Sequence, residues 1–326
     1  MQYLLNQIAR GLHALVHHDG PVYRLEPRRA AQLLKRLDAQ PTREKSSSSL
    51  LVTGFITGKA GNALVIRTPG FGDAINLAQE FMRRGVGRVV DLRSGTEASQ
   101  GVRSALDESR KAFGEDDLVA SFERPGGTRP LKGLASKRPC PGAQECDVEV
   151  RLIRKETALG RDGQERPGYA LPVSLIRTPV SAGKAISVDR LLETSVHVVR
   201  QERAKGGPTV YQCADGGHVA ATFAAAKGLL EDILQRKARP DRLDDAVLDQ
   251  CVRIRNEHQA TVFRAEDIAS LLAVGQAMFD ADSRGDFNGL PSFTEGPPKP
   301  PRMLVRPGPT AVRAGAESRS QFIHRR

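Results

Sequence analysis

The chain has 326 residues, 39% of them hydrophobic, which is enough to build one large domain or two modest ones. Its formal net charge of +11 suits an anionic ligand, an acidic partner or nucleic acid, and also fits a generally Arg-rich surface. Because aromatic residues make up only 5%, Trp is absent and the basic residues are spread along the chain, we expect no nucleic-acid partner.

Three further features bound the class of protein. No run of about 18 apolar residues occurs, so no membrane span is expected. The N-terminus mixes polar with apolar residues and lacks a small-residue cleavage site, so no secretory signal is expected either. Cys140, Cys146, Cys213 and Cys251 are too few and too scattered for a disulfide framework, which indicates a reducing compartment. The first two form a Cys-x5-Cys pair without a second pair, so we predict no metal and no other cofactor.

Hydrophobic spacing and turn residues divide the chain into helices and strands. In chain order the expected helices are 2–18, 27–38, 72–84, 98–113, 189–204, 219–235, 243–255 and 265–279, and the expected strands are 50–56, 63–66, 89–92, 148–153, 170–176 and 209–212. Residues 95–145 are the least periodic stretch, and beyond the helix over 98–113 they are expected to form a long loop. The Gly-, Pro-, Arg- and Ser-rich residues 282–326 are expected to be disordered.

The order of these elements predicts three parts. Residues 1–45 form an N-terminal helical region, which a Ser-rich linker joins to the rest. Residues 46–281 form a single mixed α/β domain without internal repeats, and residues 282–326 form the tail. The fold class is therefore α/β.

One segment carries a chemical signal. Residues 209–223 read Thr-Val-Tyr-Gln-Cys-Ala-Asp-Gly-Gly-His-Val-Ala-Ala-Thr-Phe, which predicts a strand, a loop and the start of a helix. The strand would place Cys213 at its carboxyl end, and Gly216 and Gly217 let the backbone curl. The helix would direct its positive end at the sulfur, which favours a thiolate and an anion beside it. A phosphate site of this kind usually also contains an Arg, whose guanidinium holds two phosphate oxygens.

This segment resembles the signature of the protein tyrosine phosphatases, His-Cys-x-x-Gly-x-x-Arg-Thr. The likeness continues in order over roughly residues 50–280. It includes Ala63–Pro69, Phe71–Phe81, Val89–Glu97, Val148–Arg154, Ala170–Thr178, Asp189–Arg200 and Asp244–Met278. The resemblance implies one cysteine-phosphatase-type domain, with a twisted mixed sheet flanked by helices. The chain is most similar to the compact tyrosine phosphatases that bacteria inject into host cells by type III secretion. That implies a virulence effector made in the bacterial cytoplasm and delivered to the host cytoplasm.

The resemblance assigns Cys213 to the nucleophile position of a hydrolase and the residues around it to the phosphate-binding loop. The loop residues are Gln212, Ala214, Asp215, Gly216, Gly217, His218 and Val219. Three of them depart from the family. Val219 stands where the family has the phosphate-binding Arg, and Gln212 stands where it has His. Asp215 places a carboxylate in the phosphate cradle, where it would repel a dianion.

The family's Trp-Pro-Asp loop, which supplies the general acid, is also degenerate. Pro179 matches its Pro, and the acid's position falls on Val180, which cannot donate a proton. The later Gln that positions water falls near Asp267. Together these departures predict a catalytically impaired phosphatase-like protein, a pseudophosphatase, that binds a phosphorylated or acidic protein partner. The alternatives are an active divergent cysteine-dependent phosphatase with Cys213 as nucleophile, and an interaction module with a vestigial pocket.

Several residues allow more than one interpretation. Cys213 also fits an ordinary buried cysteine, and His218 a solvated loop residue, a weak cation for phosphate or a partner for Cys213 in other thiol chemistry. Asp91 and Arg93 follow a predicted strand, where they fit either a site or a structural salt bridge. Gly54–Lys59 fails the spacing of a nucleotide-binding phosphate loop, so we reject that function.

Overall fold

The computed structural model describes residues 23–41, 52–57, 62–67, 73–94, 106, 112–115, 118–132, 139–154, 168–180, 185–214, 217–257, 261–290 and 304–306. The helix predicted over 2–18, most of the helix predicted over 98–113, and the loop residues Asp215 and Gly216 lie outside these ranges.

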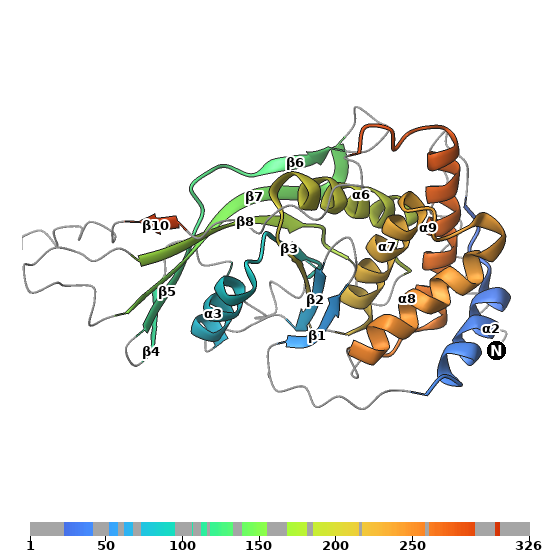
Figure 1. Cartoon of the computed structure of the whole chain (residues 1–326), viewed down its shortest axis with the longest axis horizontal. Helices are drawn as coiled ribbons and strands as arrows, with labels where there is room; N and C mark the ends of the chain where they lie inside the picture. The colour runs from blue at the N-terminus through green and yellow to red at the C-terminus, as the bar shows by residue number, and fades with distance from the viewer. Residues whose placement is uncertain are drawn as a thin grey trace, which may run out of the picture.

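A single mixed sheet runs through the molecule (Figure 1). Its strands are β1 (Val52–Thr57), β2 (Asn62–Arg67), β3 (Arg88–Asp91), β4 (Ala112–Glu115), β5 (Leu118–Glu123), β6 (Arg129–Lys132), β7 (Pro139–Arg154), β8 (Gly168–Arg177), β9 (Thr209–Cys213) and β10 (Leu304–Arg306). The order is β1-β2-β9-β3-β8-β7-β5-β4, with β6 paired to β7 and β10 to β8. The four central strands β2, β9, β3 and β8 are parallel, and the other pairings are antiparallel.

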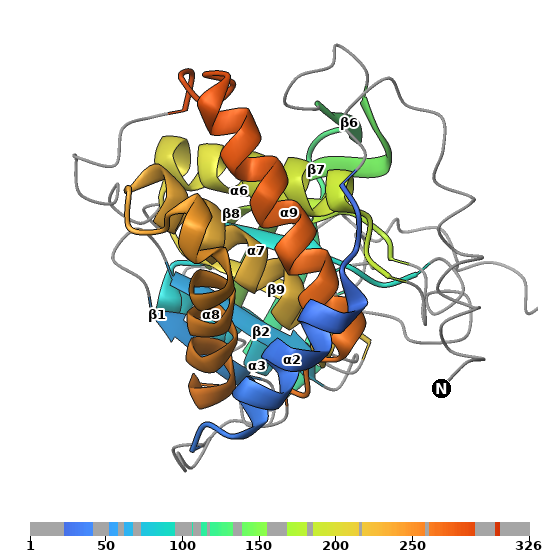
Figure 2. The same cartoon turned by 90° about the vertical axis from the view of Figure 1, so that its right-hand side faces the viewer.

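Helices cover both faces of the sheet, as the α/β prediction requires. They are α2 (Pro27–Asp38), α3 (Ala74–Arg84), α6 (Val188–Lys205), α7 (His218–Leu234), α8 (Leu243–Glu257) and α9 (Ala265–Ser283). On one face α3 packs against apolar side chains of the sheet to form the smaller core. On the other face α6, α7, α8 and α9 build the larger core, and α2 lies along α8 and α9 (Figure 2).

Local sequence explains why the helices begin and end where they do. Pro27 occupies the first turn of α2, where its missing N–H is no loss. The Ser187 side chain accepts a hydrogen bond from the backbone N–H of Arg190 and caps α6. Gly85 ends α3 in the left-handed conformation, with φ 61°, which glycine adopts without strain. None of the helices in the described part of the chain has the length and apolar character that crossing a membrane needs.

The largest error of the sequence prediction is in residues 114–145. The expected long loop contains β5, β6 and the first part of β7, and β4 begins at Ala112, inside the predicted helix. Short runs interrupted by Gly and Pro give no period of their own. The pairing of β5 and β6 with β7 makes them strands.

The two ends of the chain add to this domain. Ala30, Leu33 and Leu37 of α2 are buried in the larger core, so the described N-terminal helix shares that core. In the tail that was expected to be disordered, Leu304–Arg306 form β10.

Candidate functional site

The carboxyl ends of three parallel strands meet beside Cys213. The backbone N–H of Leu92, just after β3, donates to the carbonyl of Gln212 at 2.9 Å. The N–H of Val180, which follows β8, donates to the carbonyl of Leu92 at 3.2 Å. The tertiary structure thus brings the predicted nucleophile position and the degenerate general-acid loop to one edge of the sheet, where α/β proteins often bind ligands.

Cys213 ends β9 and is only 4% exposed. Ala214 follows it, and Gly217 immediately precedes α7, which begins at His218. The chain therefore passes from strand to helix within a few residues, and the positive end of this 17-residue helix lies at the Cys213 loop. This arrangement is the strand, loop and helix start predicted from residues 209–223.

Val219 occupies the first turn of α7, where the resemblance places an Arg. Its side chain is half-buried and packs against the larger core. A valine offers a phosphate neither charge nor a hydrogen bond. The position where the resemblance places the main cation of a phosphate site therefore contributes to the core.

His218 is tied to a carboxylate from a distant part of the chain. Its Nδ1 lies 3.1 Å from Oδ1 of Asp267, which is 4% exposed in the first turn of α9. The other oxygen of Asp267 accepts a hydrogen bond from the backbone N–H of Arg264 at 2.8 Å. One buried carboxylate thus joins the start of α7 to the start of α9.

Gln212 is fully buried, and its side-chain amide forms no hydrogen bond with any described residue. Because side chains alternate along a strand, Gln212 shares the face of β9 with Val210, on the α3 side. Cys213 lies on the opposite face, with the larger core. Gln212 is therefore a buried polar group behind the cysteine, and leaving such an amide unpartnered is costly.

The segment that would carry the general acid is held in place from three sides. Thr178 donates its N–H to the carbonyl of Asp91 at 3.0 Å, which extends the pairing of β8 with β3. The guanidinium of Arg190 donates to the carbonyl of Pro179. The Val180 side chain is 8% exposed and belongs to the larger core. The acid's position is therefore apolar and directed into the protein.

Asp91 and Arg93 form a buried ion pair at the same edge. Nε of Arg93 lies 2.9 Å from Oδ1 of Asp91, and Nη2 lies 2.6 Å from Oδ2. This two-point contact matches the structural salt bridge, one of the two roles that the sequence allowed.

Cys146 and Cys251, two cysteines away from the site, show no sign of activation. Burial raises the pKa of both the Cys146 and the Cys251 thiol, which keeps them protonated. Within the described residues, no group of three or more His, Cys, Asp and Glu side chains lies close enough together to hold a metal ion.

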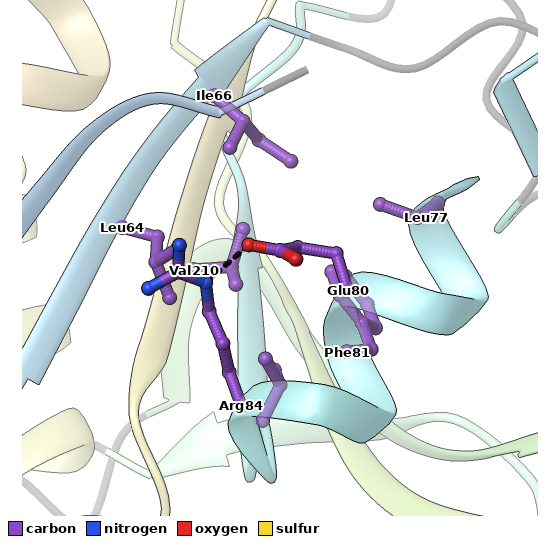
Figure 3. A pocket seen from close by; sticks show the side chains of 8 residues that line it. Leu64, Ile66, Leu77, Glu80, Phe81, Arg84 and Val210 are labelled. Carbon is purple, nitrogen blue, oxygen red and sulfur yellow. Dashed lines mark hydrogen bonds and ion pairs between the residues drawn. The ribbon is translucent and has the colours of Figure 1, made fainter. Parts of the chain in front are cut away.

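A small apolar pocket lies on the other face of the sheet, between α3 and strands β2 and β9 (Figure 3). Its lining comprises Leu64, Ile66, Leu77, Glu80, Phe81, Arg84, Val86 and Val210. Glu80 and Arg84 form an ion pair within it, and hydrogen bonds from Arg83 and Arg84 lower the pKa of Glu80. The pocket is separated from the Cys213 face by the sheet itself.

Sequence reasoning did not find the link from His218 through Asp267 to Arg264. Asp267 was singled out only as the position of a water-positioning Gln, and no local motif connects it to a residue 49 positions earlier. The hydrogen bond from the Arg190 guanidinium to the Pro179 carbonyl was missed for the same reason.

Comparison with known proteins supports the fold. No protein-family model matches the sequence, and no curated protein does. The structure is similar to the protein tyrosine phosphatase of Trypanosoma brucei, with a TM-score of 0.54 and 13% identity, covering 82% of this chain and 98% of that chain. For that of Trypanosoma cruzi the TM-score is 0.51 and the identity 15%, covering 86% of this chain and 94% of that chain. The chain therefore has a tyrosine-phosphatase-type fold, which confirms the predicted fold class.

Proposed function

We propose that this chain is a pseudophosphatase: it uses a tyrosine-phosphatase fold to bind an anionic segment of a protein partner and does not hydrolyse phosphate esters. The observation that carries the proposal is Val219, half-buried against the core at the first turn of α7. Phosphoryl transfer needs positive charge where the phosphate's charge develops, and loss of such a clamp costs several orders of magnitude in rate.

The general-acid position supports the same function. A phosphatase must protonate the leaving oxygen, and Val180 has no proton to give. Its burial, together with the hydrogen bonds on Thr178 and Pro179, leaves this segment as part of the core. Two separate catalytic requirements are thus unmet while the fold is kept, which favours binding over turnover.

Hydrolysis of para-nitrophenyl phosphate tests the absence of catalysis. We expect the purified chain and its Cys213→Ser variant to give the same background rate. Turnover that the wild type shows and Cys213→Ser loses would instead establish an active, divergent cysteine-dependent phosphatase. A contaminating phosphatase would appear equally in both preparations, so the variant also serves as the control.

A thermal-shift titration separates a working anion site from a vestigial pocket. An anion present at about 100 times its Kd stabilises the folded state by roughly 2.7 kcal/mol. We expect phosphate and vanadate to raise the unfolding temperature. No shift at tens of millimolar of either anion would favour a pure interaction module.

A further inference from the structure

The loop before α9 presents two side chains to solvent. Thr261 and Phe263 are 2% and 4% exposed and fix the loop to the core, whereas Val262 is 73% exposed and Arg264 is also exposed. This alternation directs two side chains inward and two outward. Because the inward pair is anchored, the loop offers a fixed surface made of one aliphatic group and one guanidinium.

This surface lies next to the start of α7. Asp267 accepts from the backbone N–H of Arg264 with one carboxylate oxygen and contacts the His218 ring with the other. Arg264 and the first residue of α7 are therefore separated by a single carboxylate. The long Arg side chain starts within reach of the place where α7 directs its positive end.

The Arg264 guanidinium forms no ion pair with any residue that the structure describes. Within the same part of the chain, the other cationic candidate at the loop, His218, is already engaged by Asp267. An exposed guanidinium is always charged, and its planar donors match two oxygens of a phosphate.

We propose that Arg264 supplies the cation by which the Cys213 site binds a phosphate monoester on its protein partner, in place of the Arg that Val219 has displaced. This inference rests on the proposed binding function. Val262, beside it, would contact an apolar residue next to the phosphorylated side chain. The ligand is thus a phosphorylated segment of a protein.

A carboxylate on the neighbouring first turn of α9, that of Glu266, would weaken the binding of a phosphate at this site. Glu266, half-buried in the first turn of α9, has no ion pair with another described residue. Its carboxylate complements the dipole of α9 but opposes the approach of a dianion. Removing that charge should therefore strengthen phosphate binding, in the opposite direction to removing Arg264.

Calorimetric titration of the full chain with O-phospho-L-tyrosine and with inorganic phosphate tests the proposal. We expect the wild type to bind both probes and Arg264→Gln to bind them at least roughly tenfold more weakly, the loss expected for one charged hydrogen-bonding group. Glu266→Gln should bind more tightly. Arg239→Gln is the matched control, since Arg239 is also exposed but lies beyond the opposite end of α7 and should leave binding unchanged.

Two results would overturn this assignment: equal affinity of Arg264→Gln and the wild type, or a wild type that binds neither probe. Because Arg264 is exposed, the variant should keep the wild-type unfolding temperature, which shows that any loss of binding is local. Hydrolysis that depends on Cys213 would refute the proposed absence of catalysis and leave the Arg264 result standing. The two proposals therefore fail by different measurements.

Discussion

At the scale of single residues, the proposed absence of catalysis depends above all on Val219. The loop keeps a cysteine at the end of a strand and a helix start beyond it. The side chain that should complete the site packs against the core instead. The described residues thus supply the strand end and the helix start of the proposed phosphate site without its main charge, and that charge is the part that stabilises a phosphoryl transition state.

Restoring that charge should restore anion affinity but not turnover. Val219→Arg places a guanidinium at the first turn of α7, so we expect affinity for inorganic phosphate to rise by at least roughly tenfold. Val219→Met is the control for side-chain length, and calorimetric titration measures the phosphate affinity of both variants. Hydrolysis should stay at background because Val180 still provides no acid. An affinity equal in the Arg and Met variants would contradict the assignment of this position.

Some residues of the candidate site could be found from a short stretch of sequence, and others only from contacts between distant segments. Cys213, His218 and Val219 follow one another in a recognisable segment, so the sequence predicted their common location. The contact of His218 with Asp267 requires the starts of α7 and α9 to lie side by side, and no local sequence pattern predicts that. Arg264 was not singled out from the sequence, because the role proposed for it depends entirely on that contact.

At the scale of elements, a buried charge cluster joins α6 to α7 at the end of β9 opposite the site. Nζ of Lys227 lies 2.8 Å from Glu202 and 2.8 Å from Glu231. Glu202 also accepts from the Thr209 hydroxyl at 2.6 Å and lies 3.4 Å from Nη1 of Arg88. Burial disfavours the charge on Lys227, but the two carboxylates outweigh it and raise its pKa. The charge on Lys227 is thus stabilised by its neighbours, whereas burial prevails at Glu231 and raises its pKa.

Removing the central cation should therefore be severe. Lys227→Met leaves two buried carboxylates without their shared partner, and we expect the free energy of unfolding to fall by about 3–5 kcal/mol. Urea denaturation measures the loss. Lys205→Met, whose parent side chain is 48% exposed, is the control and should change stability by about 1 kcal/mol or less. A loss as small as that in the control would show that the cluster does not depend on Lys227.

Helices were predicted better than strands at the edge of the sheet. The helix predicted over 27–38 coincides with α2, and the helices predicted over 189–204 and 265–279 nearly coincide with α6 and α9. Each of these helices has a long apolar stripe and a recognisable start. Strands β4, β5 and β6 are short, and their residues become strands through neighbours that are distant in sequence. Their conformation therefore could not be inferred from local spacing.

At the scale of the whole molecule, Glu145 connects the antiparallel half of the sheet to the helical layer. It lies on β7 and is 4% exposed. Gln201 of α6 donates to it at 3.1 Å, Arg129 of β6 donates to it at 3.3 Å, and His197 of α6 lies 3.4 Å away. Burial opposes its ionisation, yet the neighbouring His197 and Arg129 side chains prevail and lower its pKa to about 2.

This pKa makes stability depend on pH in a defined window. The folded value of about 2 lies below the ordinary value of 4.5, so the stabilisation is complete above about pH 5 and is lost as the pH falls toward 2. We expect the free energy of unfolding of the wild type to exceed that of Glu145→Gln by about 2 kcal/mol at pH 6, a figure that allows for the exposure of Arg129. At pH 3 the difference should be smaller. Chemical denaturation at the two pH values measures this difference. Asp241→Asn, at an exposed position, is the control, and a gap that did not narrow at pH 3 would contradict this role of Glu145.

The sequence by itself determined the fold class, most of the helices, the strand–loop–helix that contains Cys213, and the chemistry absent at Val219 and Val180. These features are local, because helical period, glycine content and side-chain type can be read within a few residues. Tertiary structure alone decided the edge strands, the burial of Val180, the carboxylate that joins His218 to Arg264, and the charge cluster around Lys227. Each of these is a contact between segments far apart in the chain, and such contacts exist only once the sheet and its helical layers have packed.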